Sequence, residues 1–136
     1  MPCGRCCSPA TSSLVETLRA PGHTAYGGAD IGEVVTTAQR ITAGDYDSWY
    51  EQWAATAERT EAEARAQLAA GRRVSACDGL LRAATYWRSA EFFTRDRDPD
   101  PRGRAAYEAS VGCFAGAAAL MSPAVTPVTI PFEGTP

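Results

Sequence analysis

The chain has 136 residues, of which 45% are hydrophobic and 21% are charged, and its 13 basic and 16 acidic side chains leave a net charge of -3. This length suits one soluble domain with its own core, because a compact fold of this size buries roughly two-thirds of the surface that its unfolded chain exposes. The acidic balance argues against a nucleic-acid partner, since phosphate binding needs an excess of positive charge.

No segment has the character of a membrane anchor or an export signal. The longest nearly apolar run, Val111 to Met121, is far shorter than the roughly 20 residues that cross a bilayer. The 5 cysteines are an odd number, which implies no disulfide framework. We therefore expect no membrane association and a cytoplasmic location.

The first 13 residues are small, polar and cysteine-rich. Because they show no hydrophobic periodicity, we interpret residues 1–13 as a disordered tail. Cys3, Cys6 and Cys7 have the spacing of half a zinc site, but such a site needs four ligands and the one histidine, His23, stands apart. We predict no metal ion and no cofactor.

Hydrophobic periodicity predicts a mainly α-helical domain over residues 14–123 with four hairpin-connected helices. The helices are expected over residues 29–41, 45–71, 75–93 and 101–121. Side chains that accept from the free amides of a first helical turn mark the expected starts. These are Asp30, Asp45 or Ser48 (with Glu51), Ser75 (with Asp78), and Asp100 followed by Pro101.

Four aromatic residues recur at helical spacing in the second helix: Tyr46, Trp49, Tyr50 and Trp53. A buried aromatic core is the favoured interpretation, because large aromatic side chains dominate buried area. A ligand pocket lined by Trp49, Tyr50 and Trp53 is the alternative.

The third helix carries Arg82 and Arg88 among apolar residues. Two such arginines suit the binding of a carboxylate. The alternative is that they bridge neighbouring helices or extend their charged ends to solvent.

After Pro123 the pattern changes, because Val128, Ile130 and Phe132 alternate with other residues at a period of two. With two prolines around it, this segment within residues 124–136 is expected to be one edge β-strand. A single strand cannot satisfy its own backbone, and no second strand pattern occurs in the chain. We therefore expect the sequence to stop inside a larger unit.

The sequence contains no G-x-S-x-G, no H-E-x-x-H and no glycine-rich phosphate loop. Residues 112–116 (GCFAG) superficially resemble a nucleophile elbow, but their surroundings are helical and no base is identifiable for Cys113. Gly112 and Gly116 instead suggest a close approach between helices. We assign no catalytic, cofactor-binding or metal-binding residue.

Three blocks carry a resemblance to a known family: YGGADIGEV (26–34), GDYDSWYEQW (44–53) and SACDGLLRAATYWRSAEFF (75–93). They follow one another as in bacterial serine hydrolases with an N-terminal helical cap. The chain resembles the group of 2,6-dihydropseudooxynicotine hydrolase and of proteins labelled dipeptidyl aminopeptidase. Residues 126–135 resemble the strand that opens the α/β-hydrolase sheet of that group.

The resemblance implies a cap or lid that covers the active-site mouth, shapes the pocket for a carbonyl substrate (an ester, an amide or a C–C bond) and contributes to homodimerisation. The serine, acid and histidine of the family lie beyond the end of this chain, so we expect it to be catalytically incompetent alone and to partner an α/β-hydrolase catalytic domain. The candidates for facing the pocket or that domain are Trp49, Tyr50, Trp53, Arg82, Tyr86 and Arg88.

Two other interpretations stay open. The first is a free-standing helical-hairpin module of the tetratricopeptide kind, although the expected helices differ in length and no period near about 34 residues repeats. The second is a nonfunctional gene fragment.

Overall fold

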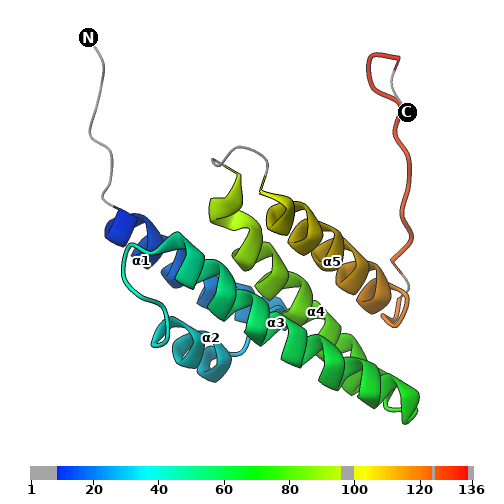
Figure 1. Cartoon of the computed structure of the whole chain (residues 1–136). Coiled ribbons are helices and arrows are strands. Elements are labelled where there is room, and N and C mark those ends of the chain that lie inside the picture. The colour runs from blue at the N-terminus through cyan, green and yellow to red at the C-terminus, as the bar shows by residue number, and fades with distance from the viewer. Residues whose placement is uncertain (1–8, 96–99, 124, 135–136) are drawn as a thin grey trace.

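A computed structural model describes residues 9–95, 100–123 and 125–134 of the chain (Figure 1). The elements in chain order are α1 (Pro9–Arg19), the 3-10 helix η1 (Ala20–Tyr26), α2 (Ile31–Ala38), α3 (Tyr46–Ala69), α4 (Arg73–Glu91), the 3-10 helix η2 (Phe92–Thr94) and α5 (Pro101–Ala118). The described residues are thus mainly helical, as predicted.

Helices α3, α4 and α5 lie side by side, with α4 between the other two (Figure 1). A short turn joins α3 to α4, and its Gly71 has a φ of 77°, a conformation that glycine adopts without strain. Because the connection is so short, α3 and α4 run antiparallel. Helix α2 packs on α3, and η1 packs on α4.

Three of the predicted N-caps are confirmed. Asp30 accepts from the backbone amide of Glu33, and Asp100 accepts from that of Arg102. Asp45 caps α3 by accepting from the amides of Asp47 and Ser48. A free first-turn amide needs such an acceptor, which is why these residue types mark helix starts.

Two predicted capping boxes are wrong. Ser48 lies inside α3, where its hydroxyl accepts from the amide of Thr42 instead of capping the helix. Helix α4 begins at Arg73, before Ser75, and Arg72 at its N-cap makes no side-chain capping bond. The turn at Gly71 leads straight into α4, so its start is set by the α3–α4 hairpin.

The N-terminal helices α1 and η1 were not predicted from the sequence. Helix α1 begins at Pro9, inside the segment interpreted as a disordered tail, while residues 1–8 with Cys3, Cys6 and Cys7 lie outside the described residues. The apolar spacing of Leu14 and Leu18 was the available signal, but it is short and surrounded by polar residues.

The predicted edge strand is not formed in residues 125–134. These residues form no β-strand, and Phe132 alone takes part in an isolated β-bridge. Val128, Ile130 and Phe132 are 79%, 77% and 70% exposed, on a segment that leads away from the helices (Figure 1). A strand requires a neighbouring strand for its backbone hydrogen bonds, and the described residues offer none.

The core is aromatic at its centre. The ring centroids of Trp49 and Phe93 lie 5.0 Å apart, and those of Trp53 and Tyr86 lie 5.6 Å apart. The three largest of these side chains, Trp49, Trp53 and Tyr86, are almost completely buried. The interpretation of the aromatic stripe as core is therefore confirmed for both tryptophans.

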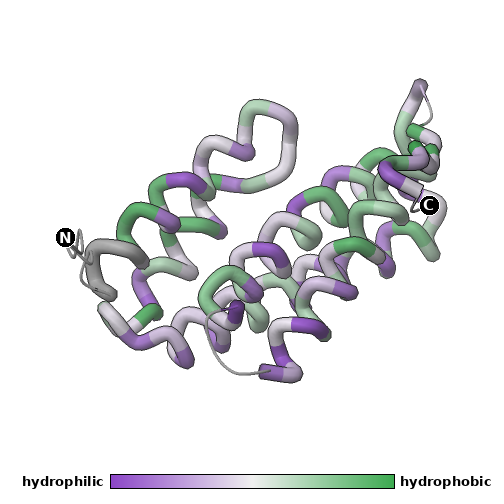
Figure 2. The backbone as a smooth tube through the Cα atoms, turned by 90° about the horizontal axis from the view of Figure 1, so that it is seen from above, coloured by the Kyte–Doolittle hydropathy of each residue, from purple (hydrophilic) through white to green (hydrophobic). Residues whose placement is uncertain are grey.

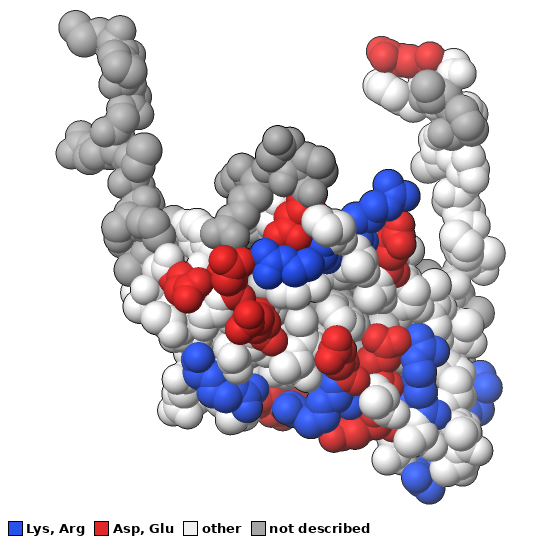
Figure 3. Space-filling model, viewed as in Figure 1, with Lys and Arg blue, Asp and Glu red and all other residues white. Residues whose placement is uncertain are grey.

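Hydrophobic and hydrophilic residues alternate at short intervals along the helices (Figure 2). None of the helices in the described part of the chain combines the length and the apolar character that crossing a bilayer requires. Acidic and basic side chains lie next to one another on the face shown in Figure 3. On α3, Arg65 pairs with Glu61 at 2.6 Å across one helical turn.

Candidate functional site

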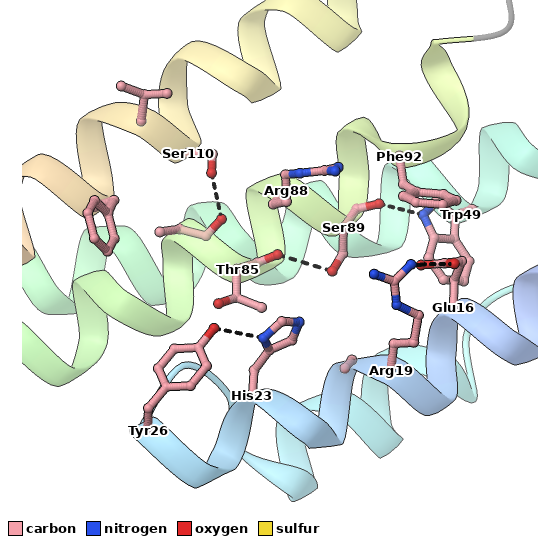
Figure 4. Close-up of a pocket in the computed structure, with 14 residues that line it drawn as sticks. Glu16, Arg19, His23, Tyr26, Trp49, Thr85, Arg88, Ser89, Phe92 and Ser110 are labelled. Atoms are coloured by element: carbon pink, nitrogen blue, oxygen red, sulfur yellow. Dashed lines mark hydrogen bonds and ion pairs between the residues drawn. The ribbon is translucent and has the colours of Figure 1, made fainter. Parts of the chain in front are cut away.

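A groove of about 430 Å³ lies over helix α4. Helix α4 supplies its floor, α1 and η1 supply one wall, and α5 supplies the other (Figure 4). Its lining residues are Glu16, Arg19, Ala20, His23, Tyr26, Trp49, Ala84, Thr85, Arg88, Ser89, Phe92, Ser110, Val111 and Phe114. The groove thus combines an apolar surface with a few polar groups, as small-molecule sites do.

Three hydroxyl groups in the groove donate their protons to the backbone. Thr85 donates to the carbonyl oxygen of Leu81 at 3.3 Å, and Ser89 donates to that of Thr85 at 3.0 Å. Ser110 of α5 donates across to the carbonyl oxygen of Ala84 at 2.8 Å (Figure 4). Each hydroxyl has one proton, so these oxygens offer a bound molecule acceptors rather than donors.

Two arginines flank the Phe92 ring. The guanidinium carbon of Arg19 lies 6.0 Å from the ring centroid, and that of Arg88 lies 5.9 Å from it. Arg19 is paired with Glu16 at 2.9 Å, and Arg88 is paired with Glu91 at 2.8 Å. This end of the groove therefore presents guanidinium donors whose charges are balanced by carboxylates.

His23 and Tyr26 form a second polar group on the η1 wall. The His23 Nδ1 atom and the Tyr26 hydroxyl lie 2.7 Å apart, and the two rings meet edge to face (Figure 4). Either atom can be the donor, depending on the tautomer of the imidazole. The bond fixes both side chains at the edge of the groove.

Two of the six predicted site residues line this groove. Trp49 is almost fully buried beneath it, and its indole Nε1 donates to the carbonyl oxygen of Ser89 at 2.7 Å. Arg88 lies on the groove surface beside Phe92. Trp53, one helical turn beyond Trp49, is wholly buried in the core and does not line the groove.

Arg82 and Tyr86 form a separate cluster with helix α2. The Tyr86 hydroxyl donates to Glu33 at 2.7 Å and accepts from the amide of Asp30 at 2.9 Å, while Arg82 donates to Glu33 at 3.2 Å. Burial, and then the hydrogen bond to the Glu33 carboxylate, raise the pKa of Tyr86 well above its usual value. The phenol therefore stays protonated and ties α2 to α4.

Tyr50 lies in a third place, against the start of α5. The Arg102 guanidinium stands 4.9 Å from its ring centroid, and Arg102 is also paired with Asp47 at 2.8 Å. Burial raises the pKa of the Tyr50 phenol, although the charge of Arg102 opposes the shift. The six predicted residues thus occupy the groove, the core, the α2 cluster and the start of α5, rather than one site.

Sequence reasoning missed most of the groove wall. Glu16, Arg19 and the His23–Tyr26 pair belong to α1 and η1, which were not predicted as helices. Phe92 was part of the third helical pattern, but its contact with Arg19 joins residues 73 positions apart. A contact of that kind has no local signature in a single sequence.

The Cys113 thiol is not an activated nucleophile. This thiol is fully buried, and burial followed by the charge of Glu61 raises its pKa to about 12, so it remains protonated at neutral pH. A protonated, buried thiol is not nucleophilic. Within the described ranges, no group of three or more His, Cys, Asp and Glu side chains is arranged to hold a metal ion.

The described part of the chain is thus a helical module with a groove of the size of a small-molecule site. Comparison with known proteins shows which proteins this module is related to. The chain is 42% identical over 118 residues to 20-hydroxy-prefusarin hydrolase FUS2 from Gibberella moniliformis, a match that covers 87% of this chain and 28% of that protein. It is 37% identical over 126 residues to hydrolase LUC6 from a Fusarium species, covering 93% of this chain and 30% of the relative.

A third relative is named as an α/β-hydrolase outright. Alpha/beta hydrolase xenA from Xenoacremonium sinensis is 35% identical over 127 residues, covering 93% of this chain and 29% of that protein. No protein-family model and no solved structure matches the chain. The chain therefore has homologues named as α/β-hydrolases, as the motifs predicted.

The matches cover most of this chain but only a small part of each relative. The chain spans less than a third of the length of each of these three relatives, although nearly all of the chain is matched. This is consistent with a fragment of an α/β-hydrolase. All three relatives are fungal, so the bacterial group identified from the motifs stays a prediction.

Proposed function

We propose that this chain is the N-terminal cap of a serine α/β-hydrolase and that it is catalytically incompetent by itself. The observation that carries the proposal is the combination of two facts. Most of the chain matches less than a third of each hydrolase, and its described residues form helices with no strand of a hydrolase sheet. A purely helical portion of an α/β-hydrolase is most simply a cap laid over the catalytic sheet.

In this proposal the catalytic domain supplies the chemistry. An activated serine attacks the carbonyl carbon of an ester, an amide or a ketone that undergoes C–C cleavage, and an oxyanion hole stabilises the intermediate. The cap covers that site and positions the substrate. The segment that follows the helices, described up to Gly134, exposes the side chains of Val128, Ile130 and Phe132, and in this proposal it joins the edge of the catalytic sheet.

A chimera tests the cap role. This chain replaces the matching segment of the 20-hydroxy-prefusarin hydrolase, and hydrolysis of p-nitrophenyl esters is compared for the chimera, the hydrolase without its matching segment, and this chain alone. We expect serine-inhibitor-sensitive turnover from the chimera, a loss of at least tenfold in kcat/KM without a cap, and no turnover from the chain alone.

Two outcomes would contradict the proposal. Serine-inhibitor-sensitive turnover by the isolated chain would show that it carries its own catalytic site. A chimera no more active than the hydrolase without its matching segment would show that the chain does not act as a cap.

A further inference from the structure

The C-terminal part of the chain carries no charge over a long stretch. Although 21% of all residues are charged, residues 109–132 contain no Asp, Glu, Lys, Arg or His. The stretch covers the last turns of α5 and most of the described segment that follows this helix (Figure 1). Because the surface of a soluble domain is normally rich in charged side chains of both signs, a surface without them differs from an ordinary solvated one.

Large apolar side chains are exposed within this stretch. On α5, Val111 and Phe114 are each 51% exposed, and beyond the helix Val128, Ile130 and Phe132 are mostly exposed. Val111 and Phe114 lie three positions apart, so they are neighbours on the helix surface. They also belong to the α5 wall of the groove over α4. Apolar side chains that gather in one exposed area mark an interaction surface, whereas single ones are normal.

Small residues lie next to these two side chains on α5. Gly112 is exposed, and a Cβ atom added to it would meet nothing within 4 Å. Glycine destabilises a helix relative to alanine, and no contact among the described residues requires a glycine here. Ala115 and Ala119 are exposed and follow Gly112 at helical spacing. Because the side chains at a contact set how closely two elements approach, this surface allows a close approach by another backbone.

Helix α3, on the other side of α4, presents a different surface. Its exposed side chains include those of Glu51, Glu58, Arg59, Glu63 and Arg65. Ion pairs run along the helix, with Arg59 and Glu63 joined at 3.9 Å. Alternating charges of this kind are typical of a helix face that stays in water. The last turns of α5 therefore differ from α3 in what they offer to a partner.

We propose that the uncharged surface of α5 docks on the catalytic domain of the proposed hydrolase. We call it the α5 face, and its members are Val111, Gly112, Phe114, Ala115 and Ala119. The choice of this partner rests on the proposed cap function. Since Val111 and Phe114 also line the groove over α4, the docked domain lies along one wall of that groove.

Two observations favour the catalytic domain as the partner. More than two-thirds of each relative lies outside the part that this chain matches, so a large domain is available to cover the face. The α5 face is also continuous with the segment that joins the catalytic sheet in the proposed function. Ala119 and Val125 are six positions apart. Six residues span at most about 22 Å, which is less than the diameter of roughly 45 Å of a domain of about 250 residues.

Hydroxyl-radical footprinting of the chimera with the 20-hydroxy-prefusarin hydrolase tests the docking. The oxidation rate of a side chain in this experiment reports its exposure to solvent. We expect Phe114 to react at least threefold more slowly in the chimera than in the isolated 136-residue chain, because docking covers it. Ile31 of α2 is the control, since it is 60% exposed and lies beyond α3 from α5 (Figure 1). Its rate should change by less than 1.5-fold.

Paired substitutions test whether the α5 face carries the docking. Val111→Gln with Gly112→Gln makes the face polar and bulky and leaves Phe114 as the reporter. In the chimera this variant should return the Phe114 rate to within twofold of its value in the isolated chain.

The matched control is Ile31→Gln with Val35→Gln, two exposed apolar residues on one side of α2, which should leave Phe114 protected. If the double variant of α5 does not fold, Gly112→Gln alone should raise the Phe114 rate in the chimera at least twofold, because its side chain enters open space in the isolated chain.

Three results would overturn the proposal. They are equal Phe114 rates in the chimera and the isolated chain, full protection of Phe114 in the α5 variant, and a Phe114 rate that falls with the concentration of the isolated chain, which would place a second copy on the face. The two proposals fail separately. An active chimera with Phe114 exposed contradicts the docking alone, and an inactive chimera with Phe114 covered contradicts the cap role alone.

Discussion

At the scale of single residues, Tyr86 connects two parts of the fold. Its hydroxyl is donor to Glu33 and acceptor from the amide of Asp30, the N-cap of α2. The ring itself is fully buried against Trp53. One side chain of α4 therefore fixes both the start and the first turn of α2.

Replacing Tyr86 by phenylalanine should lower the free energy of unfolding by about 1–3 kcal/mol, because it leaves the Asp30 amide and the Glu33 carboxylate without this partner. Urea denaturation followed by circular dichroism measures the change. Tyr107→Phe is the control, since Tyr107 is half exposed on α5 and should change the stability by less than about 0.5 kcal/mol. Equal stability of Y86F and the unaltered chain would contradict the role of the hydroxyl.

We expect the free energy of unfolding to fall at alkaline pH because of Cys113. Its pKa in the fold, about 12, lies above its ordinary value of 9.0, so the unfolded chain releases this proton first as the pH rises. Stability from this group is complete below about pH 9 and is lost between about pH 9 and pH 12. At about pH 10.5 the loss should be about 2 kcal/mol.

The measurement is urea denaturation at a series of alkaline pH values. Cys113→Ala should be less stable at neutral pH, because it leaves a small cavity, but its stability should fall less steeply above about pH 9 than that of the unaltered chain. Parallel pH profiles for the two chains would show that Cys113 does not cause the alkaline loss.

At the scale of the elements, a small-residue contact sets the distance between α3 and α4. A Cβ atom added at Gly79 would stand 2.7 Å from the Cβ of Ala64, closer than real Cβ atoms approach. On α5, Gly116 has Leu80 of α4 at 3.2 Å from an added Cβ, whereas Gly112 faces open space. Of the two glycines predicted to allow a close helix approach, only Gly116 is at such a contact.

A glycine-to-alanine substitution should therefore have opposite effects on the stability of the protein in α4 and in α5. Gly79→Ala should destabilise the protein by about 1–3 kcal/mol, because α3 must move away from α4. Gly112→Ala should stabilise it by up to about 1 kcal/mol, because alanine favours the helix and meets nothing there. Thermal unfolding of both variants checks this, and a G79A chain as stable as G112A would contradict the tight α3–α4 contact.

Element prediction succeeded where local chemistry fixes a helix start. Asp30, Asp45 and Asp100 act on amides within the next three residues, so sequence proximity is enough to find them. The start of α4 was not found, because α4 has no side-chain cap at its N-terminus that local sequence could mark. Helix α1 was not found, because its apolar spacing is short and is surrounded by polar residues. The strand expected after Pro123 needs a partner strand, which is a property of a larger assembly.

At the scale of the whole molecule, the packing is uneven. Helices α3, α4 and α5 share the hydrophobic core, whereas α1 exposes Leu14 by 58% and Leu18 by 67%. The apolar face of α1 therefore contributes little buried area to the fold. In the proposed hydrolase, we expect the catalytic domain to cover these leucines.

Amide hydrogen exchange should reflect this difference. We expect the amides of α1 to exchange at least 100-fold faster than the central amides of α4, because local opening of α1 exposes little additional apolar surface. In the hydrolase chimera the α1 amides should become more protected. Protection of α1 equal to that of α4 in the isolated chain would show that α1 belongs to the cooperative core.

The sequence by itself determined the helical class, the aromatic core and the resemblance to α/β-hydrolases, because periodicity, capping and ordered motifs are local properties of the chain. Only the tertiary structure decided which of the predicted site residues lie close together. It placed Trp49 and Arg88 at the groove, Arg82 and Tyr86 at Glu33, and joined Arg19 to Phe92 across 73 positions. Contacts between distant segments depend on how helices pack, and packing is decided by the complementarity of whole surfaces rather than by any single stretch of residues.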